Sequence, residues 1–218
     1  MLVLALDAST YAGSVALIAD GAVQAEAVAA MRGEQEERLM PAISDMLFRN
    51  SIALDRVNAV ACGAGPGSFT SLRIAASIAK GFCVARNVPL LVAPSALLVV
   101  GAAEPELAPR SYVVAMDAMR GDFFWHDVRI DAGGNIVPGI SSRTTRSELE
   151  RHAYERGAQV IGPSESPPLN PHARGFARLI QAGIAKQVEM TTWEPNYGRK
   201  AEAQVRWEAA HGRELDTV

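Results

Sequence analysis

The residues best suited to chemistry lie in a glycine-rich stretch, GPGSFTSLR, at residues 65–73. Glycines let backbone amides approach an anion closely, and a helix that starts after such a loop adds a favourable dipole. The stretch lacks the terminal Gly-Lys-Ser/Thr of a P-loop, however, and carries Pro66 where a free amide would be useful. A rigid strand-to-helix connection capped by Ser68 or Thr70 is therefore favoured over a nucleotide-binding loop. The candidate residues under either interpretation are Gly65, Gly67, Ser68, Thr70 and Arg73.

A second polar group, Asp7 with Ser9 and Thr10, follows the first apolar run of the chain. A carboxylate at the end of a strand could orient a metal-bound water. A kinase-like site needs a second acidic group, for which Asp117 is the only symmetric candidate. In the alternative interpretation, both aspartates serve the turns that follow their strands, and this alternative favours a protein without catalysis.

Residues that bind metals or act as nucleophiles form no recognisable pattern. Cys62 and Cys83 lie in apolar runs without a ligand at metal-binding spacing, which is typical of buried thiols. The nucleophile-elbow pattern Gly-x-Ser-x-Gly is absent from the sequence. All histidines lie in the second half, and the default interpretation is that they are solvated: His126, His152, His172 and His211. We expect no metal site.

The composition predicts a globular protein that does not bind nucleic acid by itself. Of 218 residues, 49% are hydrophobic and 21% are charged, which is enough for a sizeable core. The net charge of −3 argues against binding through counterion release, so an RNA substrate would need a partner's basic surface. The N-terminus lacks the features of a secretory signal, and no apolar run has the length of a membrane span. We expect a cytoplasmic protein.

The chain alternates strand-like and helix-like segments in an order that occurs twice. Residues 2–7, 14–19 and 22–30 predict three antiparallel strands, because Asp20-Gly21 is a strong hairpin signal. A helix, a strand, a helix and a strand follow at 36–49, 57–62, 71–86 and 90–93, and the second half gives strands at 112–117, 122–130, 136–143 and 160–162 with helices at 146–156 and 173–182.

This repeat predicts an α/β protein with two βββαβα lobes. The pattern resembles the actin, sugar kinase and Hsp70 (ASKHA) superfamily, and the similar starts at residues 5–8 (ALDA) and 115–118 (AMDA) support a duplication. Residues 101–109 are the natural linker, so we expect a first lobe at 1–100 and a smaller, reduced second lobe with a tail at 101–218.

The helix at 71–86 has two apolar faces and only a narrow polar stripe. One face would pack on its own sheet, while small residues such as Ala76 and Gly81 would let a second helix approach closely. The alternative is that both helices of the first lobe are simply buried within it. The residues expected at a partner or dimer interface are Leu39, Met40, Ile43, Met46, Leu47, Ile74, Ala75 and Ile78.

Four stretches together resemble the TsaB (YeaZ) family over almost the whole chain. They are LALDAST at 4–10, GPGSFTSLR at 65–73, VAMDA at 114–118 and EPNYGR at 194–199. The resemblance implies a noncatalytic scaffold that binds the ligase TsaD, helps recruit the ATPase TsaE, and acts in the placement of threonylcarbamoyl on tRNA adenosine. It also implies pairing through the two first-lobe helices, a homodimer when alone, tRNA contact only through the complex, and no cofactor in the isolated chain, with ATP or ADP at a partner interface.

One residue departs from the family pattern. Members often carry a histidine near the start of the first helix, where this chain has Gln35, so a role for that histidine is in doubt here. The competing hypothesis is a small sugar kinase-like phosphotransferase. The absence of a P-loop lysine from the sequence and the reduced second lobe favour the scaffold, and ATP turnover by the isolated protein would discriminate between the two.

Overall fold

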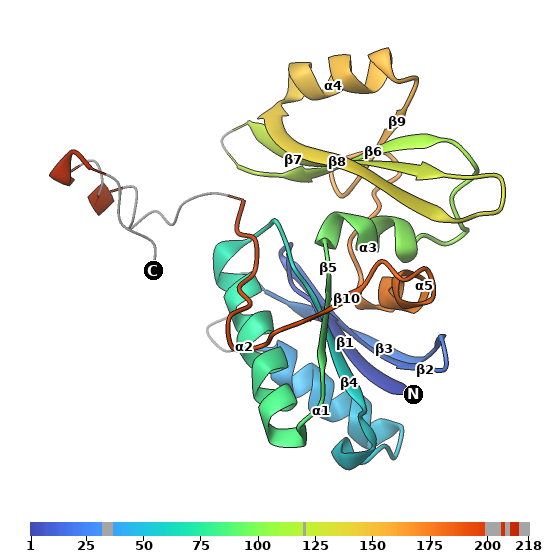
Figure 1. Cartoon of the computed structure of the whole chain (residues 1–218), viewed down its shortest axis with the longest axis vertical. Helices are drawn as coiled ribbons and strands as arrows, with labels where there is room; N and C mark the ends of the chain where they lie inside the picture. Colours follow the sequence, from blue (N-terminus) through green and yellow to red (C-terminus); the bar gives the residue numbers. More distant parts are fainter. Residues whose placement is uncertain (32–36, 120, 199–205, 208–209, 214–218) are drawn as a thin grey trace.

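A computed structural model describes residues 1–31, 37–119, 121–198, 206–207 and 210–213, and its first sheet is built mainly from the first half of the chain (Figure 1). Three antiparallel strands are followed by two strands that run parallel to the first. A short strand from near the C-terminus pairs antiparallel with the last of these. The order is β10-β5-β4-β1-β2-β3, with β1 Leu2–Asp7, β2 Ala12–Ala19, β3 Ala22–Ala30, β4 Ala59–Gly63, β5 Leu90–Ala93 and β10 Lys186–Val188.

The second sheet repeats the start of the first. It has the order β8-β7-β6-β9, with β6 Ser111–Asp117, β7 Asp122–Ile130, β8 Ile136–Thr145 and β9 Gln159–Ile161. Strands β6, β7 and β8 form an antiparallel meander, and β9 runs parallel to β6, as β4 does to β1. No strand equivalent to β5 follows β9 in this four-stranded sheet as described. The duplicated ASKHA fold with a reduced second lobe is thus confirmed.

Helices cover both sheets and fill the space between them (Figure 1). Helices α1 (Leu39–Arg49) and α2 (Phe69–Arg86) pack on one face of the first sheet, against the side chains of Leu4, Leu6 and their neighbours. The opposite face packs against α3 (Ser95–Gly101), the short η2 (Ala173–Gly175) and α5 (Phe176–Gln181). Helix α4 (Arg146–Glu155) covers the outer face of the second sheet.

Helix α3 was not expected from the sequence. Its residues, SALLVVG, are buried on every side because both sheets contact it, so it shows no polar face that would mark a helical period. A short apolar run of this kind cannot be assigned to strand or helix by periodicity. The expected linker therefore begins at the last residue of a central helix.

The chain after the second sheet returns to the first lobe. Residues 173–181 pack on α3 and on β2, and β10 then pairs with β5. The expected second lobe ran from 101 to 218, whereas the segment from 173 to 188 packs with elements of the first sheet. Most of the helix-like stretch expected at 201–210 lies outside the described residues.

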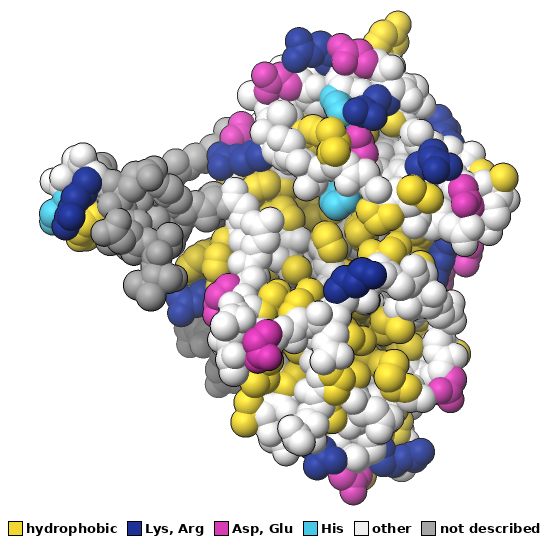
Figure 2. Space-filling model, in the orientation of Figure 1, with side chains coloured by type: hydrophobic (Ala, Val, Ile, Leu, Met, Phe, Trp, Pro, Cys, Tyr) yellow, Lys and Arg dark blue, Asp and Glu magenta, His cyan; other side chains and the backbone are white. Residues whose placement is uncertain are grey.

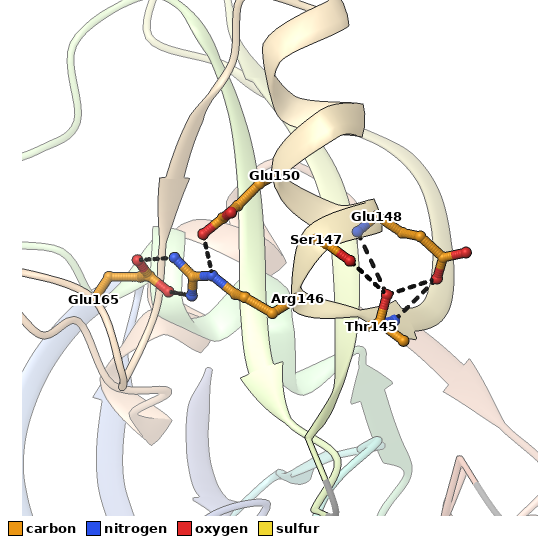
Figure 3. A network of polar contacts seen from close by, with 6 residues as sticks. All are labelled: Thr145, Arg146, Ser147, Glu148, Glu150 and Glu165. Carbon is orange, nitrogen blue, oxygen red and sulfur yellow. Dashed lines mark hydrogen bonds and ion pairs between the residues drawn. The ribbon is translucent and has the colours of Figure 1, made fainter.

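Helices α2 and α4 begin in different ways. The N-cap residue of α2 is Ser68, and its side chain makes no capping hydrogen bond; its Oγ lies 3.0 Å from Ser71 Oγ. The prediction that Ser68 or Thr70 caps this helix was therefore wrong. Helix α4 begins with a capping box between Thr145 and Glu148, and Arg146 in its first turn pairs with Glu150 and Glu165 (Figure 3).

None of the helices among the described residues is long and apolar enough to cross a membrane. A short 3-10 turn, η1 (Leu54–Arg56), completes the first lobe.

Candidate functional site

Asp7 lies at the end of β1 and is fully buried. Its Oδ1 accepts a hydrogen bond from Ser95 Oγ at 2.6 Å, and its Oδ2 accepts from Ser9 N at 3.1 Å and Ser9 Oγ at 2.8 Å. Burial raises the pKa of this carboxyl above its usual value, and the hydrogen bonds from Ser95 and Ser9 oppose the rise. The carboxylate thus links the β1–β2 turn to the start of α3 through hydrogen bonds.

The glycine-rich loop packs directly against this turn. A Cβ at Gly67 would lie 2.1 Å from Ser9 O, and Ser68 N donates to that oxygen at 2.8 Å. Gly65 has a φ of 80°, and its N–H donates to Ser95 Oγ at 3.0 Å. These backbone groups bond to the protein itself. The geometry therefore agrees with a rigid strand-to-helix connection, although no capping hydrogen bond contributes to it.

A small cavity lies between the two lobes beside this loop. Its volume is about 160 Å³, and its lining includes Ser9, Thr10, Ser68, Asp117 and Phe124. No lysine or arginine is among its described lining residues. Sites for cofactors and drug-sized ligands usually measure about 300 to 1,000 Å³, so this cavity has room for a fragment of a nucleotide only.

The other two candidates of the loop, Thr70 and Arg73, face away from this cavity. They are exposed on the first turns of α2, where the Arg73 guanidinium lies 5.5 Å from the centroid of the Phe69 ring. An open hollow of about 440 Å³ follows this part of the helix. We call it the α2 hollow; its lining is Glu37, Phe69, Thr70, Arg73, Ile74, Ser77 and Ile78.

The residues expected at a partner interface divide into two groups. Leu39, Ile43, Met46 and Ala75 are buried in the core against the first sheet, since the apolar face of an amphipathic helix packs first on its own lobe. Met40 is 39% exposed, and the half-buried members are Leu47, Ile74 and Ile78. Of the small residues, Ala76 is also buried, whereas Gly81 faces open space.

Two further apolar side chains on these helices were not singled out from the sequence. Phe48 near the end of α1 is 85% exposed and Val84 near the end of α2 is 67% exposed. Each lies one or two residues along its helix from a buried side chain, and this spacing places it on a different face of the helix. The same spacing in the sequence could have identified both as exposed. With Met40, Ile74 and Ile78, they give the two helices an outer face that is apolar at several positions.

The histidines lie outside α1 and α2, whereas Cys83 lies on α2. His152 Nε2 is 2.8 Å from Asp127 Oδ1, and His126 is buried, in contrast to the default expectation of a solvated side chain. Both thiols are buried, and burial raises the pKa of Cys83 to about 11. Among the described residues, no group of three or more His, Cys, Asp or Glu could hold a metal ion.

Charge and apolar surface are unevenly distributed. On the face drawn in Figure 2, hydrophobic side chains gather across the middle, and charged side chains lie mainly over the second lobe and at the opposite end. Several of the ion pairs described lie in the second lobe, such as Arg143–Asp122 and Arg146–Glu165. The apolar outer positions of α1 and α2 thus differ from the charged surface of the second lobe.

Comparisons with known proteins agree on one family. The family model described as "TsaD: tRNA N6-adenosine threonylcarbamoyltransferase" matches residues 30–152, from just before α1 into α4. The Escherichia coli relative "tRNA threonylcarbamoyladenosine biosynthesis protein TsaB" is 34% identical over 162 residues, which are 74% of this chain and 68% of that protein. A relative of the same name from Haemophilus influenzae is 33% identical over 59% of this chain and 54% of its own length. The solved structure "YeaZ from Pseudomonas aeruginosa" is 25% identical with a TM-score of 0.73, and the match covers 90% of this chain and 99% of that chain.

Proposed function

The chain belongs to the TsaB family of tRNA threonylcarbamoyladenosine biosynthesis proteins, and we propose that within this process it is a noncatalytic scaffold that binds and orders a TsaD-type ligase. In this proposal the ligase docks on the outer faces of α1 and α2, and the assembled pair helps to recruit a TsaE-type ATPase. The chain contacts tRNA only through the complex. Alone, it pairs with a second copy through the same helices.

The observation that carries the proposal is the outer face of α2. Ile74 and Ile78 are half-buried at successive turns, and Val84 continues the helix with 67% of its surface exposed. Helix α2 packs its inner residues on the first sheet, so its own lobe covers these outer side chains only in part. A partly exposed apolar stripe of this kind is typical of a helix that docks against another protein.

The geometry around Asp7 supports a role without catalysis. A catalytic carboxylate must reach a substrate, whereas the Asp7 oxygens accept hydrogen bonds from Ser9 and Ser95 in a fully buried position. The nearby cavity of about 160 Å³ is too small for a nucleotide, which disfavours the alternative of a sugar kinase-like phosphotransferase. Any ATP or ADP would then bind where a partner completes the site.

The net charge supports an indirect contact with tRNA. At −3, the chain lacks the excess of cations that drives binding to a phosphate backbone. We therefore propose that the partner provides the basic surface. Purified protein should show neither tight tRNA binding at physiological salt nor turnover of ATP, and multiple turnover by the isolated chain would support the phosphotransferase instead.

The test is a charge placed on the outer face of α2. Ile74 is a sharper position than Ile78, because Ile78 also packs partly against the core of its own lobe. Ile74→Glu should cost about 2 to 4 kcal/mol of association, since a carboxylate would have to lose its hydration in the interface. The dissociation constant for the purified TsaD-type ligase is measured by titration calorimetry, and the homodimer by sedimentation velocity.

The matched control is Ile140→Glu, the same change at a side chain that is 59% exposed on β8 of the second lobe. It should leave both associations unchanged. Circular dichroism reports whether each variant is folded. If folded Ile74→Glu still binds the ligase as tightly as the parent, the ligase docks elsewhere and the proposal is wrong.

A further inference from the structure

The described chain after β10 contains a segment that crosses both α2 and the glycine-rich loop. Residues Trp193–Gly198 run alongside α2 toward its N-terminal end (Figure 1). We call this segment the strap. Its sequence, WEPNYG, contains most of the last stretch that resembles the family, and the proposed function gives it no role.

The strap contacts α2 at two levels. In the middle of the helix, Lys80 Nζ lies 3.0 Å from Glu194 Oε1 and 5.9 Å from the centroid of the Trp193 ring. At the first turn, the rings of Phe69 and Tyr197 have centroids 4.5 Å apart at an interplanar angle of 44°. The strap therefore follows the helix from its centre to its start, antiparallel to it.

The strap also closes over the glycine-rich loop and reaches the second lobe. Asn196 N donates to Ala64 O at 2.8 Å, and a Cβ at Gly65 would lie 2.3 Å from Asn196 O. At the end of the strap, Gly198 has a φ of 67°, and a Cβ there would lie 2.3 Å from the Phe124 ring. Phe124 lines the cavity between the lobes, so the strap contacts both lobes as well as α2.

One of these contacts involves a residue that lines the α2 hollow. Phe69 packs against Tyr197 and lines the hollow with Arg73, whose guanidinium lies over the Phe69 ring. The first turn of α2 has no side-chain cap, and a helix end without one loses its order more readily than the middle of the helix. The strap is thus placed where this turn needs an external constraint.

We propose that the strap is a positioning element for the partner-binding face, in which Tyr197 fixes Phe69 and Arg73 so that the α2 hollow is already formed in the free protein. This inference rests on the proposed function, because it assigns the hollow to the ligase. A preformed hollow binds more tightly, since the partner does not have to order the first turn of the helix when it docks. Because the strap also contacts Phe124 of the second lobe, the arrangement of the two lobes helps to hold the strap in place.

The test compares three variants of the full chain. Tyr197→Ala removes the ring contact with Phe69, whereas Tyr197→Phe keeps the ring and loses only the hydroxyl, which lies 3.4 Å from Glu194 Oε2. Tyr154→Ala is the matched control, because Tyr154 is 87% exposed on α4 and far along the chain from the strap. Two measurements are made: hydrogen exchange of residues 69–76 in the free protein, and the dissociation constant for the purified TsaD-type ligase.

Tyr197→Ala should exchange faster in residues 69–76 and bind the ligase about tenfold more weakly, as expected for the loss of one aromatic contact of about 1.4 kcal/mol. Tyr197→Phe and Tyr154→Ala should match the parent in both measurements. The inference is overturned if folded Tyr197→Ala keeps the parental exchange and affinity, or if it only lowers the melting temperature.

The two proposals fail in different ways. A parent chain that does not bind the ligase would refute the proposed function and, with it, the role of the strap in docking. Binding that is lost in Ile74→Glu but unchanged in Tyr197→Ala would support the docking face and refute the strap.

Discussion

The two lobes carry an aspartate at the same position of a duplicated unit and use it differently. Asp7 at the end of β1 is fully buried and accepts three hydrogen bonds, whereas Asp117 at the end of β6 is exposed and its Oδ1 accepts from Met119 N at 2.6 Å. In the first lobe, the loop after β4 and the start of α3 close over the carboxylate. The second sheet as described has no strand equivalent to β5 and no helix directly after β9, so its aspartate stays open.

This difference shows that similar local sequences reach different burial and hydrogen bonding, depending on which distant segments pack over them. Each aspartate follows an apolar strand and precedes a turn, and local sequence alone would assign both the same role. Only the first has neighbours that remove it from water. A duplication can therefore keep the strand pattern while the two copies of one residue differ in burial and hydrogen bonding.

The largest effect should come from enlarging the glycine that brings the loop against the β1–β2 turn. Gly67→Ala places a Cβ 2.1 Å from the backbone oxygen of Ser9, so the loop and the turn must separate. We expect a loss of about 3 kcal/mol in the free energy of unfolding, measured by urea denaturation. Gly121→Ala in the β6–β7 turn of the second lobe is the control. Its Cβ meets open space, and the cost there is only the strain of about 1 kcal/mol at a φ of 88°. Equal costs would contradict the proposed rigidity of the first-lobe connection.

The next prediction concerns the pH dependence of stability. Because burial raises the pKa of Asp7, the folded state binds more protons than the unfolded state above the usual value of 3.8, and stability falls as the pH rises through this range. The Asp7→Asn variant lacks the titrating group, so its free energy of unfolding relative to that of the parent should rise as the pH rises above this value. Urea denaturation of both proteins at a series of pH values measures the difference. A pH-independent difference between Asp7→Asn and the parent would show that the buried carboxylate does not change its protonation on unfolding.

The smallest effect should distinguish the starts of α2 in the first lobe and α4 in the second. Thr145→Ala removes the capping box of α4 and should cost about 1 kcal/mol, whereas Ser68→Ala should cost less than about 0.5 kcal/mol because Ser68 makes no capping hydrogen bond to α2. Thermal unfolding followed by circular dichroism measures both. A cost at Ser68 equal to that at Thr145 would mean that the start of α2 is held by its own side chain and does not need the strap.

The sequence alone determined the strands, the long helices and their duplication. Apolar residues at alternating or helical spacing are set by local geometry, so β1, α1 and α2 were predicted close to their observed bounds. The start of α2 at Phe69, two residues before the expected Ser71, is a small difference of the kind common at helix ends. The hairpin at Asp20-Gly21 was predicted for the same local reason.

Only the tertiary structure decided which faces are covered and by what. Leu39, Ile43 and Met46 share an apolar face, but a period cannot tell whether a face meets its own sheet or a partner, and here they enter the core. Helix α3 could not be predicted from periodicity, because both sheets bury it and leave it no polar face. The Asp7 carboxyl accepts a hydrogen bond from Ser95, which is 88 residues away in the sequence. The contact of Tyr197 with Phe69 likewise joins residues that are close only in the fold. Periodicity is encoded locally, whereas burial arises from contacts between distant segments, and these contacts give the polar residues their roles.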